Sequence, residues 1–182
     1  MMSMLQLISV LAATALYFGF YQLNELLFSA LEVHKGANWI FLPAGMRLLC
    51  TLVLGGEGAI GLLLASFVIS FGPQAHADIV TAVIAPVISA GAPYLIYRFA
   101  LFRGMPASLE ELNAKSLSLL IVMYAAGSSF LHSVWYSMRG ISADFLSGLT
   151  AMFVGDLIGT MIVIYTIKSL IAVFDRYKPK ID

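Results

Sequence analysis

Six long apolar stretches follow one another along this chain of 182 residues, with only short polar segments between them. A helix needs about 20 mostly apolar residues to cross the hydrocarbon core of a bilayer, which is about 30 Å thick. Hydrophobic residues make up 60% of the chain and charged residues 11%, whereas soluble domains hold about 45–50% and about 25%. A soluble fold of this length could not bury so much apolar surface. The sequence therefore predicts one all-α integral membrane domain over residues 1–182, and it excludes a soluble globular enzyme.

We expect a six-helix transmembrane bundle with short loops. The expected spans are Met4–Leu31, Asn38–Leu54, Gly58–Phe71, Ile79–Phe102, Leu117–Met138 and Phe145–Phe174. The division between the second and third spans rests on the segment Gly55-Gly56-Glu57-Gly58. One merged helix of about 35 residues would exceed about 50 Å at 1.5 Å per residue, and three glycines with a carboxylate favour a turn.

The distribution of basic residues predicts the orientation of the bundle. Six spans place both termini on one side of the membrane, and cytoplasmic segments carry an excess of Lys and Arg. The side of the termini holds Arg98, Arg103, Lys115, Lys168, Arg176, Lys178 and Lys180, and the opposite loops hold Lys35 and Arg139. We therefore expect both termini in the cytoplasm.

The cytoplasmic loop after the fourth span contains Ser108 and, three residues later, Glu111. This spacing matches a capping box at the start of a helix. The segment from Leu109 to Lys115 is either a short amphipathic helix at the membrane interface or a solvated turn.

Two ionisable residues lie deep inside expected spans. Because a charged side chain at the bilayer centre costs about 2.5–3.5 kcal/mol on insertion scales, such residues face the bundle interior. Asp156 lies near the middle of the last span, close to Gly155 and Gly159 and on a helix that also carries Gly148. These small residues predict a closely packed neighbouring helix. We expect Asp156 to pair with Arg47 of the antiparallel second span, either as a structural ion pair or as a lock that an anionic ligand opens.

Polar side chains also form stripes on the first and fifth spans, at i, i+3 and i+4 spacings that place them on one helix face. We expect them to line an outward-facing pocket between spans one, two, five and six. Pro86 and Pro93 predict a kink in the fourth span, which is either purely structural or opens this pocket. The candidate ligand-binding residues are Arg47, Asp156, Glu25, Asn24, His132, Trp39, Tyr21 and Ser128.

No catalytic motif is visible, so we expect no enzymatic activity and assign no catalytic residue. The spacing of His34, His76 and His132 matches no metal-ligand pattern, and the single cysteine, Cys50, excludes a Cys-based zinc site. A net charge of zero argues against a nucleic-acid partner. No cofactor is implied.

Two segments carry a resemblance to a known family. Residues 36–68 read GANWIFLPAGMRLLCTLVLGGEGAIGLLLASFV, and residues 153–165 read FVGDLIGTMIVIY. Both are similar to the bacterial membrane-associated sensor domains of the first class (MASE-type). The matching residues are Trp39, Pro43, Gly45, Gly55, Gly61, Gly155, Asp156 and Gly159. The resemblance implies a sensor in signal transduction, located as a multi-pass protein in the bacterial cytoplasmic (inner) membrane.

The chain departs from that family in two ways. Its members usually have about eight spans and feed a cytoplasmic output domain, whereas this chain offers six spans and ends at Asp182. A sensor of this form needs a protein partner for its output.

Three functions remain open. The first is a sensor-like module that binds a small ligand or a partner protein. The second is the substrate-binding (S) subunit of an energy-coupling-factor transporter, since the length, the number of spans and the small residues Ala15 and Gly19 of the first span suit that class. The third is an assembly factor for other membrane proteins.

Overall fold

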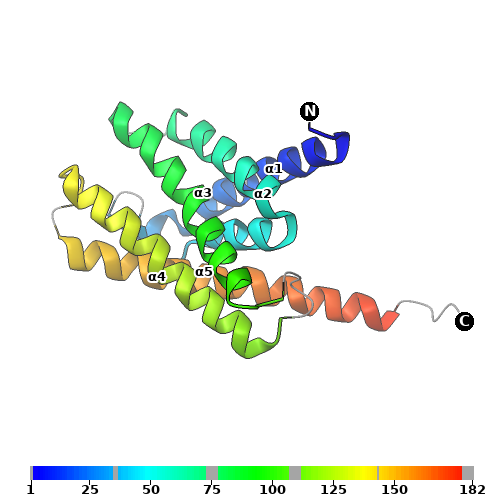
Figure 1. The fold of residues 1–182 in the computed structure, drawn as a ribbon. Coiled ribbons are helices and arrows are strands. Elements are labelled where there is room, and N and C mark those ends of the chain that lie inside the picture. Colours follow the sequence, from blue (N-terminus) through cyan, green and yellow to red (C-terminus); the bar gives the residue numbers. More distant parts are fainter. Residues whose placement is uncertain (1, 35–36, 73–77, 107–111, 143, 178–182) are drawn as a thin grey trace, which may run out of the picture.

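The computed structural model describes residues 2–34, 37–72, 78–106, 112–142 and 144–177. Almost all of this part is helical (Figure 1). The elements are α1 (Met4–Phe28), the 3₁₀ turn η1 (Ser29–Leu31), β1 (Glu32–His34), β2 (Ala37–Asn38), α2 (Leu42–Ser70), α3 (Ile79–Phe102), α4 (Ala114–Met138) and α5 (Phe145–Tyr177). The two short strands pair antiparallel between α1 and α2.

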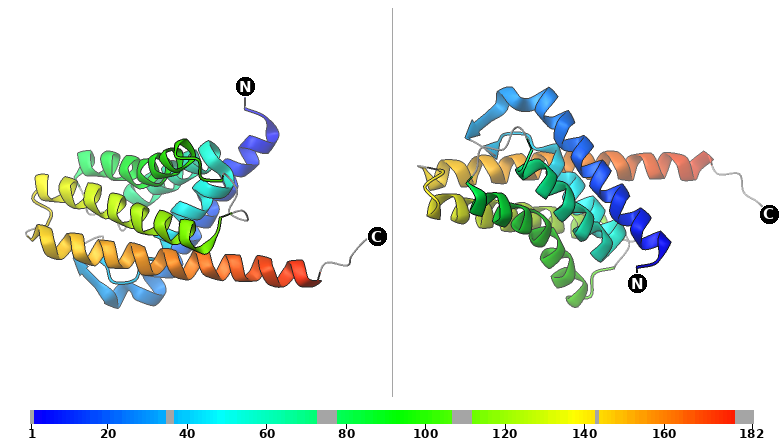
Figure 2. Two further views of the ribbon diagram at one scale, coloured as in Figure 1. Left: turned by 60° about the horizontal axis from the view of Figure 1, so that its bottom comes forward. Right: turned by 90° about the horizontal axis from the view of Figure 1, so that it is seen from above.

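Five helices in the described part of the chain are long and apolar enough to cross a membrane. The protein is therefore of the multi-pass membrane class. In all three views the start of α1 and the end of α5 lie toward the same end of the bundle, and the end of α4 and the start of α5 lie at the opposite end (Figures 1 and 2). The last part of α5 runs beyond the other helices (Figure 2).

The expected count of six spanning helices is not confirmed. The predicted second and third spans are joined as α2, which contains a non-helical residue, Gly55, at φ 57° and ψ −125°. The bend there is sharp, because a Cβ atom added to Gly58 would lie 2.2 Å from the Cys50 carbonyl oxygen, whereas residues eight apart in a straight helix are about 12 Å apart. Each arm, 42–54 and 56–70, is shorter than an ordinary span.

The bend lies at the end of the bundle where α1 begins. Gln6, in the first turn of α1, donates a side-chain hydrogen bond of 2.8 Å to Glu57. The second arm of α2 therefore returns toward the opposite end, where α3 starts at its N-cap, Asp78. Of the predicted interfacial helix at 109–115, residues 109–111 lie outside the described part of the chain. Leu112 and Asn113 are not helical, and Ala114 and Lys115 belong to α4, whose N-cap is Asn113.

The first arm of α2 is the central element of the bundle. Every residue from Leu42 to Leu52 is buried, whereas α1 buries only Val10, Ala13, Tyr17 and Asn24. The outward faces of the helices carry large apolar side chains, as a lipid environment requires. The charged side chains of Arg47 and Asp156, by contrast, are buried inside.

Glycine residues bring α5 against the start of α2. A Cβ atom added to Gly155 would lie 1.9 Å from the Asn38 carbonyl oxygen, and one added to Gly159 would lie 2.0 Å from the Phe41 carbonyl oxygen. The prediction of a closely packed neighbouring helix is confirmed for Gly159, which lies against the start of α2, whereas Gly155 packs on Asn38 and Trp39 before that helix. Gly148 instead faces Ser142 in the preceding loop. We call the contact of Gly45, Gly155 and Gly159 the α2–α5 seam.

Candidate functional site

A cavity of about 470 Å³ lies inside the bundle. We call the end lined by Glu32, Ser70 and Asp78 its mouth and the end lined by Tyr17 and Arg47 its floor. The mouth is at the end of the bundle opposite to the bend in α2. The volume falls in the range of small-molecule sites, about 300–1,000 Å³.

More elements line the cavity than the sequence predicted. Besides α1, the first arm of α2, α4 and α5, its walls include the second arm of α2, through Ser66 and Ile69, and α3, through Pro86 and Ser89. The cavity is therefore lined by more elements than the four spans expected from the sequence. The sharp bend in α2 explains the difference, because it brings the second arm back along the cavity. Pro86 of α3 lines the cavity, and Pro93 does not.

Arg47 lies at the floor and is bound by aromatic side chains. Its Nε and Nη2 atoms donate hydrogen bonds of 2.9 and 2.7 Å to the Tyr17 hydroxyl. Its guanidinium carbon is 5.3 Å from the centre of the Tyr17 ring and 5.2 Å from that of Phe41. Both distances suit cation–π contacts. These partners are neutral, so the guanidinium keeps its full positive charge beside the cavity.

Asp156 also lines the cavity, but the expected ion pair with Arg47 is not formed. Among the described residues, the one ion pair within 4.0 Å joins Arg139 and Asp78. Asp156 is close enough to Arg47 to interact electrostatically, and it contacts the Ser128 hydroxyl.

The α2–α5 seam explains why the predicted pair fails. The Phe41 amide donates a hydrogen bond of 3.1 Å to the Gly155 carbonyl oxygen, which sets Asp156 beside the start of α2. Arg47 follows six residues later, about 9 Å further along the helix. The structure also corrects the expected antiparallel arrangement: α5 runs parallel to the first arm of α2, because Gly155 lies at Phe41 and Gly159 lies at Gly45. A sequence supplies the depth of each residue within its own span, but not the offset between the two helices.

His132 is held in the cavity wall by two hydrogen bonds. Its Nδ1 atom lies 3.0 Å from the Ser128 carbonyl oxygen and its Nε2 atom 3.2 Å from the Ser89 hydroxyl. Because a carbonyl oxygen only accepts, Nδ1 carries a proton, and in the neutral ring Nε2 accepts from Ser89. The Tyr136 ring meets the imidazole edge-on at 5.9 Å.

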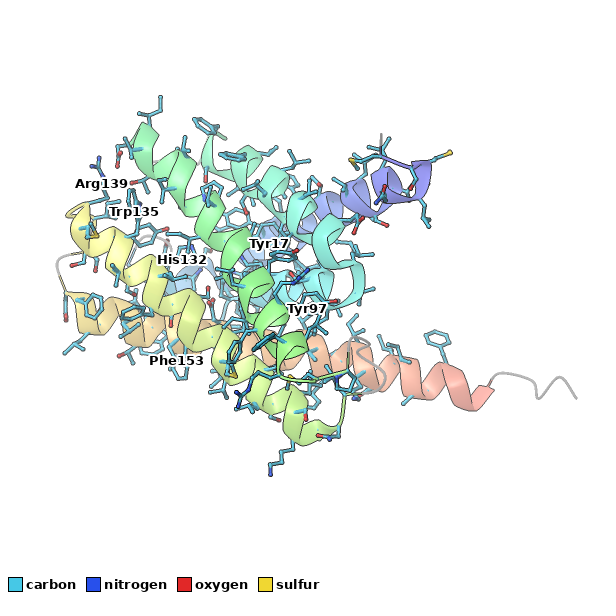
Figure 3. The ribbon with its side chains drawn as sticks, in the orientation of Figure 1. Tyr17, Tyr97, His132, Trp135, Arg139 and Phe153 are labelled. Carbon is cyan, nitrogen blue, oxygen red and sulfur yellow. The ribbon has the colours of Figure 1, made fainter. Side chains whose placement is uncertain are left out.

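A clasp between α3 and α4 lies at the mouth. The Nη2 atom of Arg139 is 2.8 Å from Oδ1 of Asp78, and the Trp135 indole donates to the Thr81 hydroxyl at 3.3 Å. Figure 3 shows His132 toward the middle of the bundle and Trp135 and Arg139 further along α4, at its end. The side chains of Asp78 and Arg139 are about 40% exposed, so the clasp is accessible to water-soluble ions.

Five of the eight candidate residues from the sequence line the cavity: Arg47, Asp156, Glu25, His132 and Tyr21. The other three do not. Asn24 is fully buried, and its Oδ1 atom accepts a hydrogen bond of 2.9 Å from the Leu42 amide. It thereby caps α2, whose own N-cap residue, Phe41, makes no side-chain cap. Trp39 is 42% exposed, and Ser128 is buried, where its carbonyl oxygen accepts from His132 and its hydroxyl contacts Asp156.

Several lining residues were not among the candidates. Glu32, Asn38 and Ser66 line the cavity, although they stand in a loop-like segment or in an apolar run. A single serine in an apolar helix carries little signal in a sequence, because serine is common at helix contacts in membranes. Within the described residues no group of three or more His, Cys, Asp or Glu side chains is placed to hold a metal ion.

Comparisons with known proteins found no family model, no curated protein and no solved structure that matches this chain.

Proposed function

We propose that the protein is a sensor-like integral membrane module that binds a small ligand in the cavity. One observation carries the proposal: a guanidinium and a carboxylate, those of Arg47 and Asp156, are both buried beside a cavity of about 470 Å³ and are not paired with each other. Unpaired charges inside a membrane protein are costly and usually mark a functional pathway or site.

Ligand binding at this position would act on helix arrangement. The cavity is lined by all five long helices, so a ligand that contacts several walls favours one arrangement over another. It shifts the equilibrium only by the difference between its affinities for the two states. The signal then passes to a partner protein, in keeping with the resemblance to bacterial membrane-associated sensor domains. We place the protein in the bacterial inner membrane, with the mouth outside and both termini in the cytoplasm, and we assign it no enzymatic activity.

A small-molecule screen by thermal unfolding of the purified protein tests this function. We expect at least one compound to raise the Tm of the wild type and to lose this effect in Asp156→Asn. The matched control is Glu57→Gln, which neutralises a carboxylate at the bend of α2, away from the cavity. Compounds that stabilise the wild type and Asp156→Asn equally would place the site elsewhere. A screen without any stabilising compound would contradict the proposal.

A second function, the substrate-binding subunit of an energy-coupling-factor transporter, is favoured by the surface of α1. Ala12, Ala15 and Gly19 share one exposed face of this helix, and no atom lies within 4 Å of a Cβ added at Gly19. Small residues allow another helix to approach closely. In that case Ala15→Leu abolishes uptake by cells that hold the partner subunits, and ligand binding persists. Normal uptake by this variant would contradict the docking of α1.

A further inference from the structure

The floor of the cavity is positive. The guanidinium of Arg47 uses its Nε and Nη2 atoms on Tyr17. A guanidinium has five N–H donors in a planar fork that matches a carboxylate. The Ser89 hydroxyl adds no donor for an anion, because it donates its proton to Nε2 of His132. The floor therefore offers the Arg47 guanidinium as the group that binds an anionic part of a ligand.

The walls nearer the mouth are negative. Glu25 follows Tyr17 by eight residues on α1, about 12 Å closer to the mouth. Asp156 lies beside the start of α2, on the mouth side of Arg47, because of the hydrogen bond between Phe41 and Gly155. Both carboxylates line the cavity, as does Glu32. The rings of Tyr21 and Tyr136 lie in the same walls, and carboxylates with aromatic rings bind ammonium groups.

Two buried polar atoms in the walls have no partner in the described protein. They are Oγ of Ser66 and Oδ1 of Asn38. Both residues are only 5% exposed and both line the cavity. A buried polar group without a hydrogen bond costs about 1–3 kcal/mol. Their presence in the same cavity indicates a polar occupant, independently of the charges.

We propose that the cavity binds a zwitterion, a small molecule with a carboxylate at Arg47 and a protonated amine at Asp156 and Glu25. The inference rests on the proposed function and adds the chemical class of the ligand. A simple anion would meet the negative charges of Glu25 and Asp156 on its way to the floor. A simple cation would bind at the walls and leave the Arg47 guanidinium uncompensated. A zwitterion whose carboxylate points to the floor pairs with Arg47 there, and its amine pairs with Asp156 and Glu25 in the walls.

The test is thermal unfolding of the purified full chain with the standard amino acids and with ω-amino acids from β-alanine to 6-aminohexanoate. For the compound that gives the largest shift, the matched half-ligands are the same molecule without its amine and the same molecule without its carboxylate. We expect the zwitterion to raise the Tm by at least about 2–4 °C at saturation. Each half-ligand should raise it by less than a third of that shift. A half-ligand that stabilises as well as the zwitterion would overturn the inference.

Two variants test which residue binds the amine of the zwitterion and which binds its carboxylate. Glu25→Gln removes a charge from a partly exposed position and leaves the packing intact, so we expect a folded protein whose affinity for the zwitterion falls about tenfold. Its affinity for the half-ligand without an amine should stay the same or rise. Arg47→Lys keeps a charge at the floor but loses the planar fork, and we expect a larger loss of affinity for both. Glu57→Gln, at the bend, should bind as the wild type does.

The outcomes separate this inference from the proposed function. If the broad screen yields a ligand that depends on Asp156 and no zwitterion binds, the function stands and the zwitterion is wrong. If no compound of any class binds, both fail. Equal binding of the zwitterion to the wild type and to Glu25→Gln and Arg47→Lys would show that it binds at another place.

Discussion

The first arm of α2 has two different sides. On the side of α5 it meets the α2–α5 seam, where glycines let backbone touch backbone. On the other side Arg47 faces a cavity of about 470 Å³. The comparison shows how a small bundle keeps two opposite charges apart inside a membrane. The dry seam sets the register between α2 and α5, and this register prevents Arg47 and Asp156 from closing on each other.

A larger side chain in the seam should therefore destabilise the protein more than one on the side of the cavity. Gly159→Val would place a Cβ atom 2.0 Å from the Phe41 carbonyl oxygen, and backbone on both sides would have to move. We expect a loss of about 3 kcal/mol or more in the free energy of unfolding, at the upper end of overpacking costs. Unfolding by denaturant in detergent micelles measures this loss.

Gly91→Val on α3 is the matched control for the seam. No atom lies within 4 Å of a Cβ added at Gly91, so we expect a change several times smaller. Equal losses for the two variants would mean that the seam is no tighter than the rest of the bundle.

The bend at Gly55 helps to form the side of the cavity, because it returns the second arm of α2 to the cavity. Gly55→Ala forces a residue with a side chain into φ 57° and ψ −125°, a conformation that is almost restricted to glycine. We expect a loss of about 1–3 kcal/mol in the free energy of unfolding. The neighbour Gly56→Ala is the control, since it has no positive φ and open space around its added Cβ. A thermal scan in which both variants unfold together would argue against strain at the bend.

The smallest effect concerns the clasp at the mouth. A hydrogen bond from Thr81, aided by Arg139, lowers the pKa of Asp78 to about 2. A carboxyl group with a lowered pKa adds stability at a pH above its unfolded value of about 3.9, and this stability is lost as the pH falls through about 2. The Tm of the wild type should therefore exceed that of Asp78→Asn by a small, constant amount from pH 7 to pH 5.

Measurements at acid pH test the direction in which this Tm difference changes. The difference between the two Tm values should shrink between pH 4 and pH 2, and 1 M salt should reduce it at neutral pH because the clasp is exposed. A difference that grows as the pH falls would contradict this assignment.

Much of the fold could be predicted from the residues. Four of the five long helices begin and end within a few residues of the expected spans, because apolar length is a local property of the chain. The glycines at 55–58 predicted the position of the bend in α2, and Gly159 predicted a tight helix contact. The number of spanning helices was not predictable in the same way, since a bend and a loop between two helices need similar residues.

The candidate site was predictable only in part. Arg47, Asp156 and His132 stood out because ionisable residues are rare in apolar spans, and all three line the cavity. Asn24 stood out as part of a polar stripe on an apolar span, but it caps the start of α2. A polar residue that satisfies a backbone amide and one that faces a cavity look the same in a sequence.

That this is a helical membrane protein with Arg47 and Asp156 turned inward follows from the residues alone, because the cost of exposing a charge to lipid applies to each residue separately. Whether these two charges pair does not follow from the residues. That outcome depends on the register and rotation of one helix against another, and contacts between backbone atoms, at Phe41 with Gly155 and Gly159, set both.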